Sequence, residues 1–167
     1  MGMSDPQAKS CLAPVVDERT RLLVCGSLPG EASLRASRYY AHPQNQFWRL
    51  MELAFGEPLA SLDYPERLDL LLRRGLGLWD TVASARRTGS LDSAIRDIAS
   101  TGLAALAATL PELRAVGFNG ATAARLGRRA LGESGLALID LPSSSPALTM
   151  DFALKAGRWA ELAKWLD

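Results

Sequence analysis

Four short apolar runs recur along the chain, at residues 22–25, 77–79, 115–118 and 136–139. Each run is followed by a glycine or a polar residue, and none alternates between apolar and polar positions. Continuous hydrophobicity over so few residues is typical of strands that are buried on both faces. We therefore predict four buried strands.

Stretches with helical periodicity separate these runs at residues 46–55, 65–74, 102–110 and 121–131, and an amphipathic stretch at 152–166 follows the last run. Asp63-x-x-Glu66 is a capping-box pattern that opens the second stretch. Strands that alternate with helices favour a parallel sheet covered on both faces. The sequence predicts an α/β protein, a three-layer α/β/α sandwich with a four-stranded, mostly parallel central sheet.

The first twenty residues are polar and interrupted by proline, with one apolar patch at residues 12–16. We expect residues 1–20 to form a leader that packs on a single domain at 21–167, because this length suits one domain. The leader lacks a secretory apolar segment, and no run approaches the ~20 apolar residues of a membrane span. We therefore expect a cytoplasmic protein with no membrane partner.

Composition and charge exclude several classes of protein and of binding site. Hydrophobic residues make up 48% of the chain and charged residues 22%, which is typical of globular proteins. A net charge of +1 argues against a broad cationic surface, so any nucleic-acid site must be local. One histidine and two cysteines are too few for a Cys/His zinc site, a four-cysteine iron–sulfur cluster or a disulfide framework. We expect a site without metal.

Two loops carry the candidate chemistry, because ligands of parallel sheets bind beyond the carboxyl ends of the strands. The first, at 26–45, begins Gly-Ser-Leu-Pro-Gly, whose glycines let the backbone approach a ligand and whose N–H groups suit an anion. The second, at 141–148, holds three serines and two prolines, which suit a phosphodiester or a sugar. A plain turn also explains either loop taken alone.

The two loops belong to a set of motifs that runs in order along most of the chain, at residues 14–16, 26–30, 33–34, 39–48, 77–80, 89–92, 118–120 and 141–146. The most specific is Tyr-Tyr-Ala-His-Pro-Gln-Asn-Gln-Phe-Trp at 39–48. The set resembles the uracil-DNA glycosylase superfamily, most closely its hypoxanthine-DNA (deoxyinosine) branch and more distantly the mismatch-specific uracil and thymine glycosylases. The resemblance implies an α/β/α fold and a DNA repair hydrolase that excises a flipped base from double-stranded DNA. It implies no metal and no organic cofactor.

The resemblance also implies that Asn45 is catalytic. A breaking N-glycosidic bond leaves a cationic sugar that water attacks with little deprotonation, so an amide that orients the water or donates to the departing base suffices. Other branches carry Asp, Asn or Glu where this sequence has Leu28, which does neither. Asn45 directly precedes a predicted helix, where asparagine is an ordinary N-cap, so two roles compete for one side chain.

The other predicted site residues fall into three groups. The expected base-binding residues are Tyr40, on which the base would stack, and Leu28, His42, Phe118 and Asn119. The expected DNA-backbone contacts are Gly26, Ser27, Gly30, Ser33, Ser143, Ser144 and Ser145. Leu148, with Met150 next, is the expected apolar wedge that replaces the flipped nucleotide. Core packing for Tyr40, a His-Pro turn for His42, a turn for Asn119 and a helix start for Leu148 are the structural alternatives.

Other functions remain open on the sequence. A G·U or G·T mismatch-specific uracil or thymine glycosylase would share these motifs, and so would a hydrolase of small nucleosides that lacks the wedge. Leu28 keeps open a module that binds lesions without cutting. We read Asp80 and Asp92 as structural, paired with arginines such as Arg86, Arg87 or Arg96. We expect a monomer with a small DNA footprint.

Overall fold

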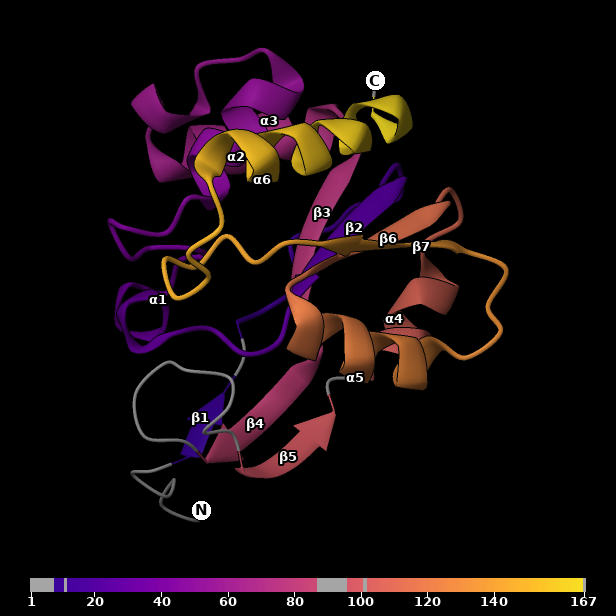
Figure 1. The fold of residues 1–167 in the computed structure, drawn as a ribbon. Coiled ribbons are helices and arrows are strands. Elements are labelled where there is room, and N and C mark those ends of the chain that lie inside the picture. The colour runs from indigo at the N-terminus through magenta and orange to yellow at the C-terminus, as the bar shows by residue number, and fades with distance from the viewer. Residues whose placement is uncertain (1–7, 11, 87–95, 101, 167) are drawn as a thin grey trace.

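The computed structural model describes residues 8–10, 12–86, 96–100 and 102–166. At its centre lie four parallel strands in the order β3–β2–β6–β7 (Figure 1). Their bounds are Leu22–Gly26 for β2, Leu76–Asp80 for β3, Ala115–Asn119 for β6 and Ala137–Leu141 for β7. All four predicted strands are present, and the sheet that they form is entirely parallel. The burial expected for them holds for β2, β3 and β6, whereas the edge strand β7 is half-buried over most of its length.

The register of this sheet brings the carboxyl ends of the strands to one edge. Gly26 at the end of β2 pairs with Asp80 at the end of β3, and Asn119 at the end of β6 pairs with Leu141 at the end of β7. Because β2 and β6 are the two central strands, the loops that leave them begin side by side at this edge.

Helices cover both faces of the sheet (Figure 1). One layer contains α2 (Phe47–Phe55), α3 (Tyr64–Arg73) and α6 (Phe152–Trp159), and the other contains α4 (Leu103–Thr109) and α5 (Ala121–Leu131). Each layer buries its own apolar cluster, one around Phe47 and Trp159 and the other around Phe118 and Leu103. The predicted three-layer α/β/α arrangement is confirmed.

Helix ends follow the local sequence. Asp63 caps α3 by accepting the Glu66 N–H at 3.0 Å, which agrees with the capping pattern. The predicted last helix is divided into α6 and a 3-10 helix at Ala160–Trp165. The sequence does not predict α1 (Glu31–Ala36) or a 3-10 turn at Leu59–Ser61, because both are too short to show a helical period.

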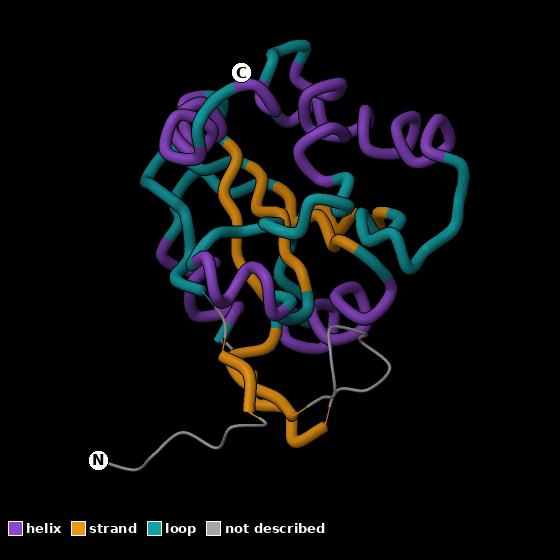
Figure 2. Tube along the Cα trace, turned by 90° about the vertical axis from the view of Figure 1, so that its left-hand side faces the viewer, coloured by secondary structure: helices purple, strands orange, loops and turns teal. Residues whose placement is uncertain are grey.

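A second, antiparallel sheet lies apart from the central one (Figure 2). Its strand order is β1–β4–β5, with bounds Ala8–Ser10, Val82–Arg86 and Arg96–Ser100. The sequence does not predict it, because these strands are short and carry no continuous apolar run, and β4 and β5 pair with irregular register. Asp92 and Arg87 lie outside the described residues, so their expected pairing has no structural counterpart here.

The segment before β2 runs along β3. Val15 and Leu78 exchange two backbone hydrogen bonds of 2.9 Å, and the Leu12 carbonyl accepts the Trp79 indole N–H at 3.2 Å. A Cβ at Gly77 would lie 2.8 Å from the Val15 carbonyl oxygen, so only glycine lets the segment approach so closely. Among the described helices, none is long and apolar enough to cross a membrane.

Candidate active site

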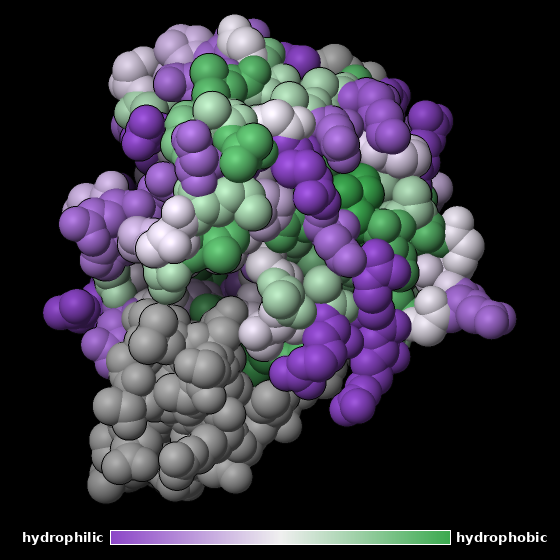
Figure 3. All heavy atoms as spheres, viewed as in Figure 1, coloured by the Kyte–Doolittle hydropathy of each residue, from purple (hydrophilic) through white to green (hydrophobic). Residues whose placement is uncertain are grey.

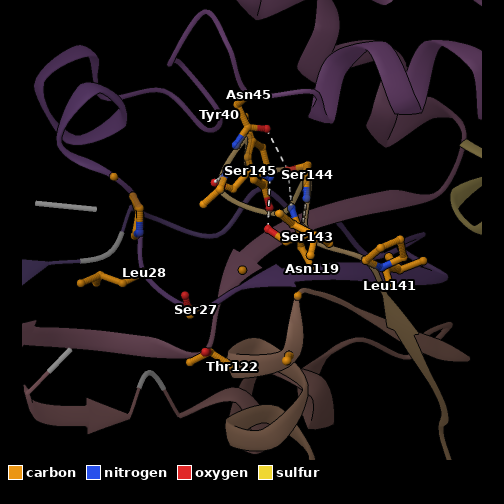
Figure 4. A pocket seen from close by; sticks show the side chains of 18 of the residues that line it. Ser27, Leu28, Tyr40, Asn45, Asn119, Thr122, Leu141, Ser143, Ser144 and Ser145 are labelled. Carbon is orange, nitrogen blue, oxygen red and sulfur yellow. Dashed lines mark hydrogen bonds between the residues drawn. The ribbon is translucent and has the colours of Figure 1, made fainter. Parts of the chain in front are cut away.

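The loops that follow the parallel strands surround a cavity of about 1280 Å³ at the carboxyl edge of the sheet. Residues from 26–33, 39–45, 119–128 and 140–150 line it, together with Asp80 and Arg158. The two loops singled out from the sequence therefore share one pocket (Figure 4).

A chain of hydrogen bonds joins three side chains of this pocket (Figure 4). The Ser144 hydroxyl donates to Asn45 Oδ1 at 2.8 Å and accepts from Asn119 Nδ2 at 2.9 Å. The Ser144 N–H donates to Asn119 Oδ1 at 2.9 Å, so Asn119 binds Ser144 through both ends of its amide. Ser144 and Asn119 are buried. The chain fixes the end of β6 and the loop after β7 against the segment that precedes α2.

The side-chain oxygen of Asn45 accepts hydrogen bonds from two donors. Besides the Ser144 hydroxyl, its Oδ1 accepts the Phe47 N–H of the first turn of α2 at 2.9 Å. These two donors fix the direction of the amide, and within the described part of the chain its Nδ2 group has no acceptor. Asn45 therefore binds the start of the helix and still presents an N–H₂ donor, so its two expected roles do not exclude each other.

Tyr40 lines the pocket in a strained backbone conformation. Its φ of +55° is left-handed, a value that bulky residues seldom adopt and that costs of order 1–3 kcal/mol. Its ring stacks on that of Phe47, with centroids 3.9 Å apart and an interplanar angle of 19°. Phe47 is fully buried and meets Trp159 edge-on. The core thus supports the Tyr40 ring from behind.

The glycines of the first loop occupy crowded or terminal positions. A Cβ at Gly26 would lie 3.0 Å from Asp80 Oδ1, tighter than most such contacts, and Asp80 itself is buried and lines the pocket. The Gly26 carbonyl accepts the Thr81 N–H at 2.8 Å, which joins this loop to the end of β3. Gly30 is the N-cap residue of α1.

Two serines expected to contact the DNA backbone are turned inward. Ser27 and Ser33 line the pocket but are buried, and the Ser33 hydroxyl accepts the Ala41 N–H at 3.0 Å. Their contact with the DNA backbone stays a prediction, and their burial restricts it to a group that enters the pocket. Leu28 is also buried and packs with Val82, forming an apolar patch of the lining.

The second loop is held in shape by its own serines. The Ser143 hydroxyl accepts the Ser145 N–H and the Ser145 hydroxyl accepts the Ala147 N–H, both at 3.1 Å. The Leu148 N–H donates to the Ser145 carbonyl at 3.2 Å. Both serines remain half-buried and line the pocket.

Two apolar side chains lie exposed at the mouth of the pocket. Leu148 is 37% exposed and Met150 is 38% exposed, and both belong to the lining. Helix α6 begins only at Phe152, capped by the Asp151 carboxylate, so neither residue opens that helix. The alternative interpretation of Leu148 as a helix start is therefore wrong.

Phe118 lies outside the pocket, contrary to the expectation. Neighbouring side chains of a strand point to opposite faces, so Asn119 reaches the pocket while Phe118 is fully buried against Gly127 of α5. His42 does line the pocket and is exposed. Its Nδ1 accepts the Gln44 N–H at 3.1 Å, so Nε2 is the ring nitrogen that remains for another partner.

Cys25 is unsuited to nucleophilic chemistry. It is fully buried at the end of β2, and burial, assisted by the negative charge of Asp80, raises the pKa of its thiol well above the usual value. No group of three or more His, Cys, Asp or Glu side chains is placed to hold a metal ion in the described ranges.

Three arginines of α5 and α6 also line the pocket. Arg128 forms a 3.0 Å ion pair with Asp140, and Arg158 donates to the Asp140 carbonyl at 3.0 Å. Arg125 also lines the pocket, with no ion pair to any described residue. Figure 3 shows a band of hydrophilic side chains over α5 and β7. Arg125 and Arg158 come together only through the fold, so adjacency in the sequence gives no sign of them.

Comparison with known proteins identifies the family. A family model described as the uracil DNA glycosylase superfamily matches residues 13–166. This chain belongs to that superfamily. Two relatives named hypoxanthine DNA glycosylase are similar to it: one from Methanosarcina barkeri, 38% identical over 93% of this chain and 98% of the relative, and one from Methanosarcina acetivorans, 40% identical over 80% and 84%.

A solved structure agrees with the uracil DNA glycosylase fold. The solution NMR structure of a protein from Methanosarcina acetivorans, provisionally named a uracil DNA glycosylase, superimposes with a TM-score of 0.82 and is 35% identical in sequence. The match covers 94% of this chain and 97% of the other. The resemblance and the fold predicted from the sequence are therefore confirmed.

A buried lysine behind this pocket is not among the residues predicted from the sequence. Lys155 of α6 is fully buried behind the second loop. A signal was available, because Lys155 falls on the apolar stripe of the helix, three residues after Phe152 and four before Trp159. A lysine on the buried face of a helix needs polar partners inside the fold.

Proposed function

We propose that this protein is a monofunctional DNA glycosylase that hydrolyses the N-glycosidic bond of deoxyinosine in double-stranded DNA, releasing hypoxanthine and leaving an abasic site. The observation that carries the proposal is Asn45, whose oxygen is bound by Ser144 and Phe47 and whose Nδ2 group remains a donor in the pocket. The names of the two Methanosarcina relatives support hypoxanthine as the base.

Asn45 acts on the leaving base. As the bond breaks, the base gains negative charge, and a donor fixed in advance stabilises that charge without reorganisation. Both lone pairs of Oδ1 are already engaged, so Asn45 is poorly placed to orient the water by accepting a hydrogen bond from it. Of the two roles expected for this amide, the geometry favours donation to the base over orientation of the water.

Attack of water on the sugar needs no strong general base. The anomeric carbon becomes cationic in the transition state, and Leu28 offers it no acceptor. Asp80 lies buried in the same pocket, beside Gly26, and a carboxylate there favours positive charge on the sugar. We assign Asp80 this electrostatic role in place of a purely structural one.

Tyr40 and His42 hold the base and its surroundings. An extruded base stacks on the Tyr40 ring, a contact that contributes ~1–3 kcal/mol in comparable sites. Phe47 behind the ring keeps it in place, and the strained backbone of Tyr40 is consistent with a position selected for binding. The Nε2–H of exposed His42 donates to the base or to a phosphate.

Residues at the mouth of the pocket bind the DNA duplex. Leu148 enters the stack in place of the flipped nucleotide, since it is apolar and exposed beside the pocket. Arg125, Arg128 and Arg158 contact phosphates across the mouth, and the Ser143 and Ser145 segment approaches the backbone next to the lesion.

Uracil is the second candidate base. The Methanosarcina acetivorans protein of similar fold is provisionally named a uracil DNA glycosylase, and the pocket contacts described here do not by themselves separate a six-membered ring from a fused one.

The test is excision from defined duplexes. Oligonucleotides that carry one deoxyinosine, one uracil, a G·U pair or a G·T pair are incubated with the protein and then treated with alkali to cut at abasic sites. Breaks at deoxyinosine alone support the proposal, and breaks at uracil or thymine favour the second candidate. Selective binding without breaks would identify a lesion-binding module instead.

A further inference from the structure

Lys155 is a buried charge that the proposed reaction does not use. Its side chain has no exposed surface, and its ammonium donates to two neutral oxygens, Gln46 Oε1 at 2.9 Å and the Ser145 carbonyl at 3.2 Å. In the part of the chain that the structure describes, no carboxylate pairs with it. Burial lowers the pKa of Lys155. An ammonium without a counterion is costly inside a protein, so its presence calls for a role.

The two oxygens belong to the two segments that meet at the catalytic amide. Gln46 directly follows Asn45, and the Gln46 N–H donates to the Ser144 carbonyl at 2.9 Å. Ser145 directly follows Ser144, and its carbonyl also accepts the Leu148 N–H, which closes the turn that carries the exposed leucine. Lys155 therefore lies behind the junction of both segments.

We propose that Lys155 is a positioning residue that clamps the 143–148 loop to the start of α2. The clamp keeps Ser144 on Asn45 Oδ1, so that Asn45 Nδ2 faces the base, and it keeps Leu148 at the mouth. An apolar side chain cannot replace it, because two buried oxygens would lose a donor. The effect on excision rests on the proposed function, whereas the clamp itself does not.

Hydrogen exchange tests the clamp without DNA. Lys155→Met keeps the long apolar stem and removes the ammonium, and Lys164→Met is the matched control because Lys164 is exposed. We expect the Gln46 and Leu148 amides to exchange at least ~10-fold faster in Lys155→Met, with the amides of β2 and β6 unchanged. Unchanged exchange at Gln46 and Leu148 overturns the clamp.

Single-turnover excision of hypoxanthine tests the positioning role. Lys155→Met should lower the rate at saturating enzyme by ~10-fold or more and raise the half-saturating enzyme concentration. Lys155→Arg, which keeps a cationic donor, should recover most of both, and Lys164→Met should change neither. Faster exchange with unaltered excision overturns the positioning role. If the unaltered protein excises no base, the proposed function fails while the exchange result still decides the clamp.

A second variant guards against a Lys155→Met protein that does not fold. Gln46→Leu removes one acceptor and leaves the ammonium on Ser145. Faster exchange of the backbone amide at position 46, after correction for the intrinsic rate of the new residue, with the Leu148 amide still protected, supports the clamp. Unaltered exchange at both amides overturns it.

Discussion

The inner wall of the pocket and its outer rim are built in opposite ways. The inner wall consists of Asn45, Ser144 and Asn119, whose side chains are joined by hydrogen bonds of 2.8 to 2.9 Å. The outer rim consists of Leu148, Met150, Arg125, Arg128 and Arg158, which are exposed apolar or cationic side chains. The wall is fixed before any ligand arrives, whereas the rim presents exposed apolar and cationic groups to a large partner.

This contrast predicts that the wall determines the rate of the chemical step and that the rim determines the affinity for DNA. Donors fixed in advance lower the barrier of the chemical step, so changes to the wall should act on the excision rate. Apolar and cationic groups at the surface contribute to association with DNA, so changes to the rim should act on affinity and salt dependence. A wall variant that changes only affinity, or a rim variant that changes only rate, would contradict the division.

The largest effect is expected for Asn45. Asn45→Ala removes the donor to the leaving base, and loss of one such donor costs ~100- to 1000-fold in rate elsewhere. Single-turnover excision of hypoxanthine, with duplex affinity measured separately, checks that the loss lies in the rate.

Asn45→Asp is the decisive companion. A carboxylate still accepts the Phe47 N–H and the Ser144 hydroxyl, so the start of α2 stays capped, but the N–H₂ donor is gone. We expect a folded and inactive protein. An active Asn45→Asp variant would contradict donation by Asn45 to the leaving base.

Ser144→Ala should have the next largest effect. It removes the bond that orients Asn45 and leaves Asn119 Nδ2 without its acceptor, so we expect a rate loss of ~10-fold and a loss of stability of ~1–3 kcal/mol. Ser134→Ala is the matched control, because Ser134 is exposed outside the pocket lining and its hydroxyl accepts only the Leu136 N–H of its own turn. Excision rates and urea unfolding of both variants test this, and equal losses in the two would contradict the role of Ser144.

The wall also shows what a sequence can and cannot predict. The central strands follow from continuous apolar runs, because strands covered on both faces are apolar along most of their length. Most helices follow from the helical period of their apolar residues. The identity of Asn45 and Tyr40 as candidates came from a family motif. Their geometry did not, since the partners of Asn45 include Ser144, which lies far away in the chain and meets it only in the fold.

The sequence does not show which way a side chain points or how deeply the fold buries it. Phe118 and Asn119 are neighbours in one motif, but strand alternation turns them to opposite faces of the sheet. Ser27 and Ser33 look like surface hydroxyls in a glycine-rich loop, yet the fold buries both. The small antiparallel sheet carries no continuous apolar run, and it forms only because separate segments of the chain pair in the fold.

At the rim, Leu148→Ala should weaken duplex binding by ~10-fold, about 1.4 kcal/mol, since less apolar surface fills the gap left by the flipped base. The rate at saturating enzyme should change less than ~2-fold. Leu53→Ala is the control, because Leu53 is 59% exposed on α2 and does not line the pocket. Titrations with a deoxyinosine duplex separate the two quantities, and a loss of rate without a loss of affinity would place Leu148 in the wall.

The smallest effect is expected for a single rim arginine. Arg125→Ala should reduce the slope of log K against log salt by about one phosphate, and Arg73→Ala, an exposed arginine of α3 outside the pocket lining, should leave it unchanged. The unaltered protein should show a slope of ~2–4 phosphates, because its net charge is only +1 and its cations gather at one mouth. An equal change in both variants would mean that the protein binds DNA through its whole surface, and the rim would then have no special part in recognition.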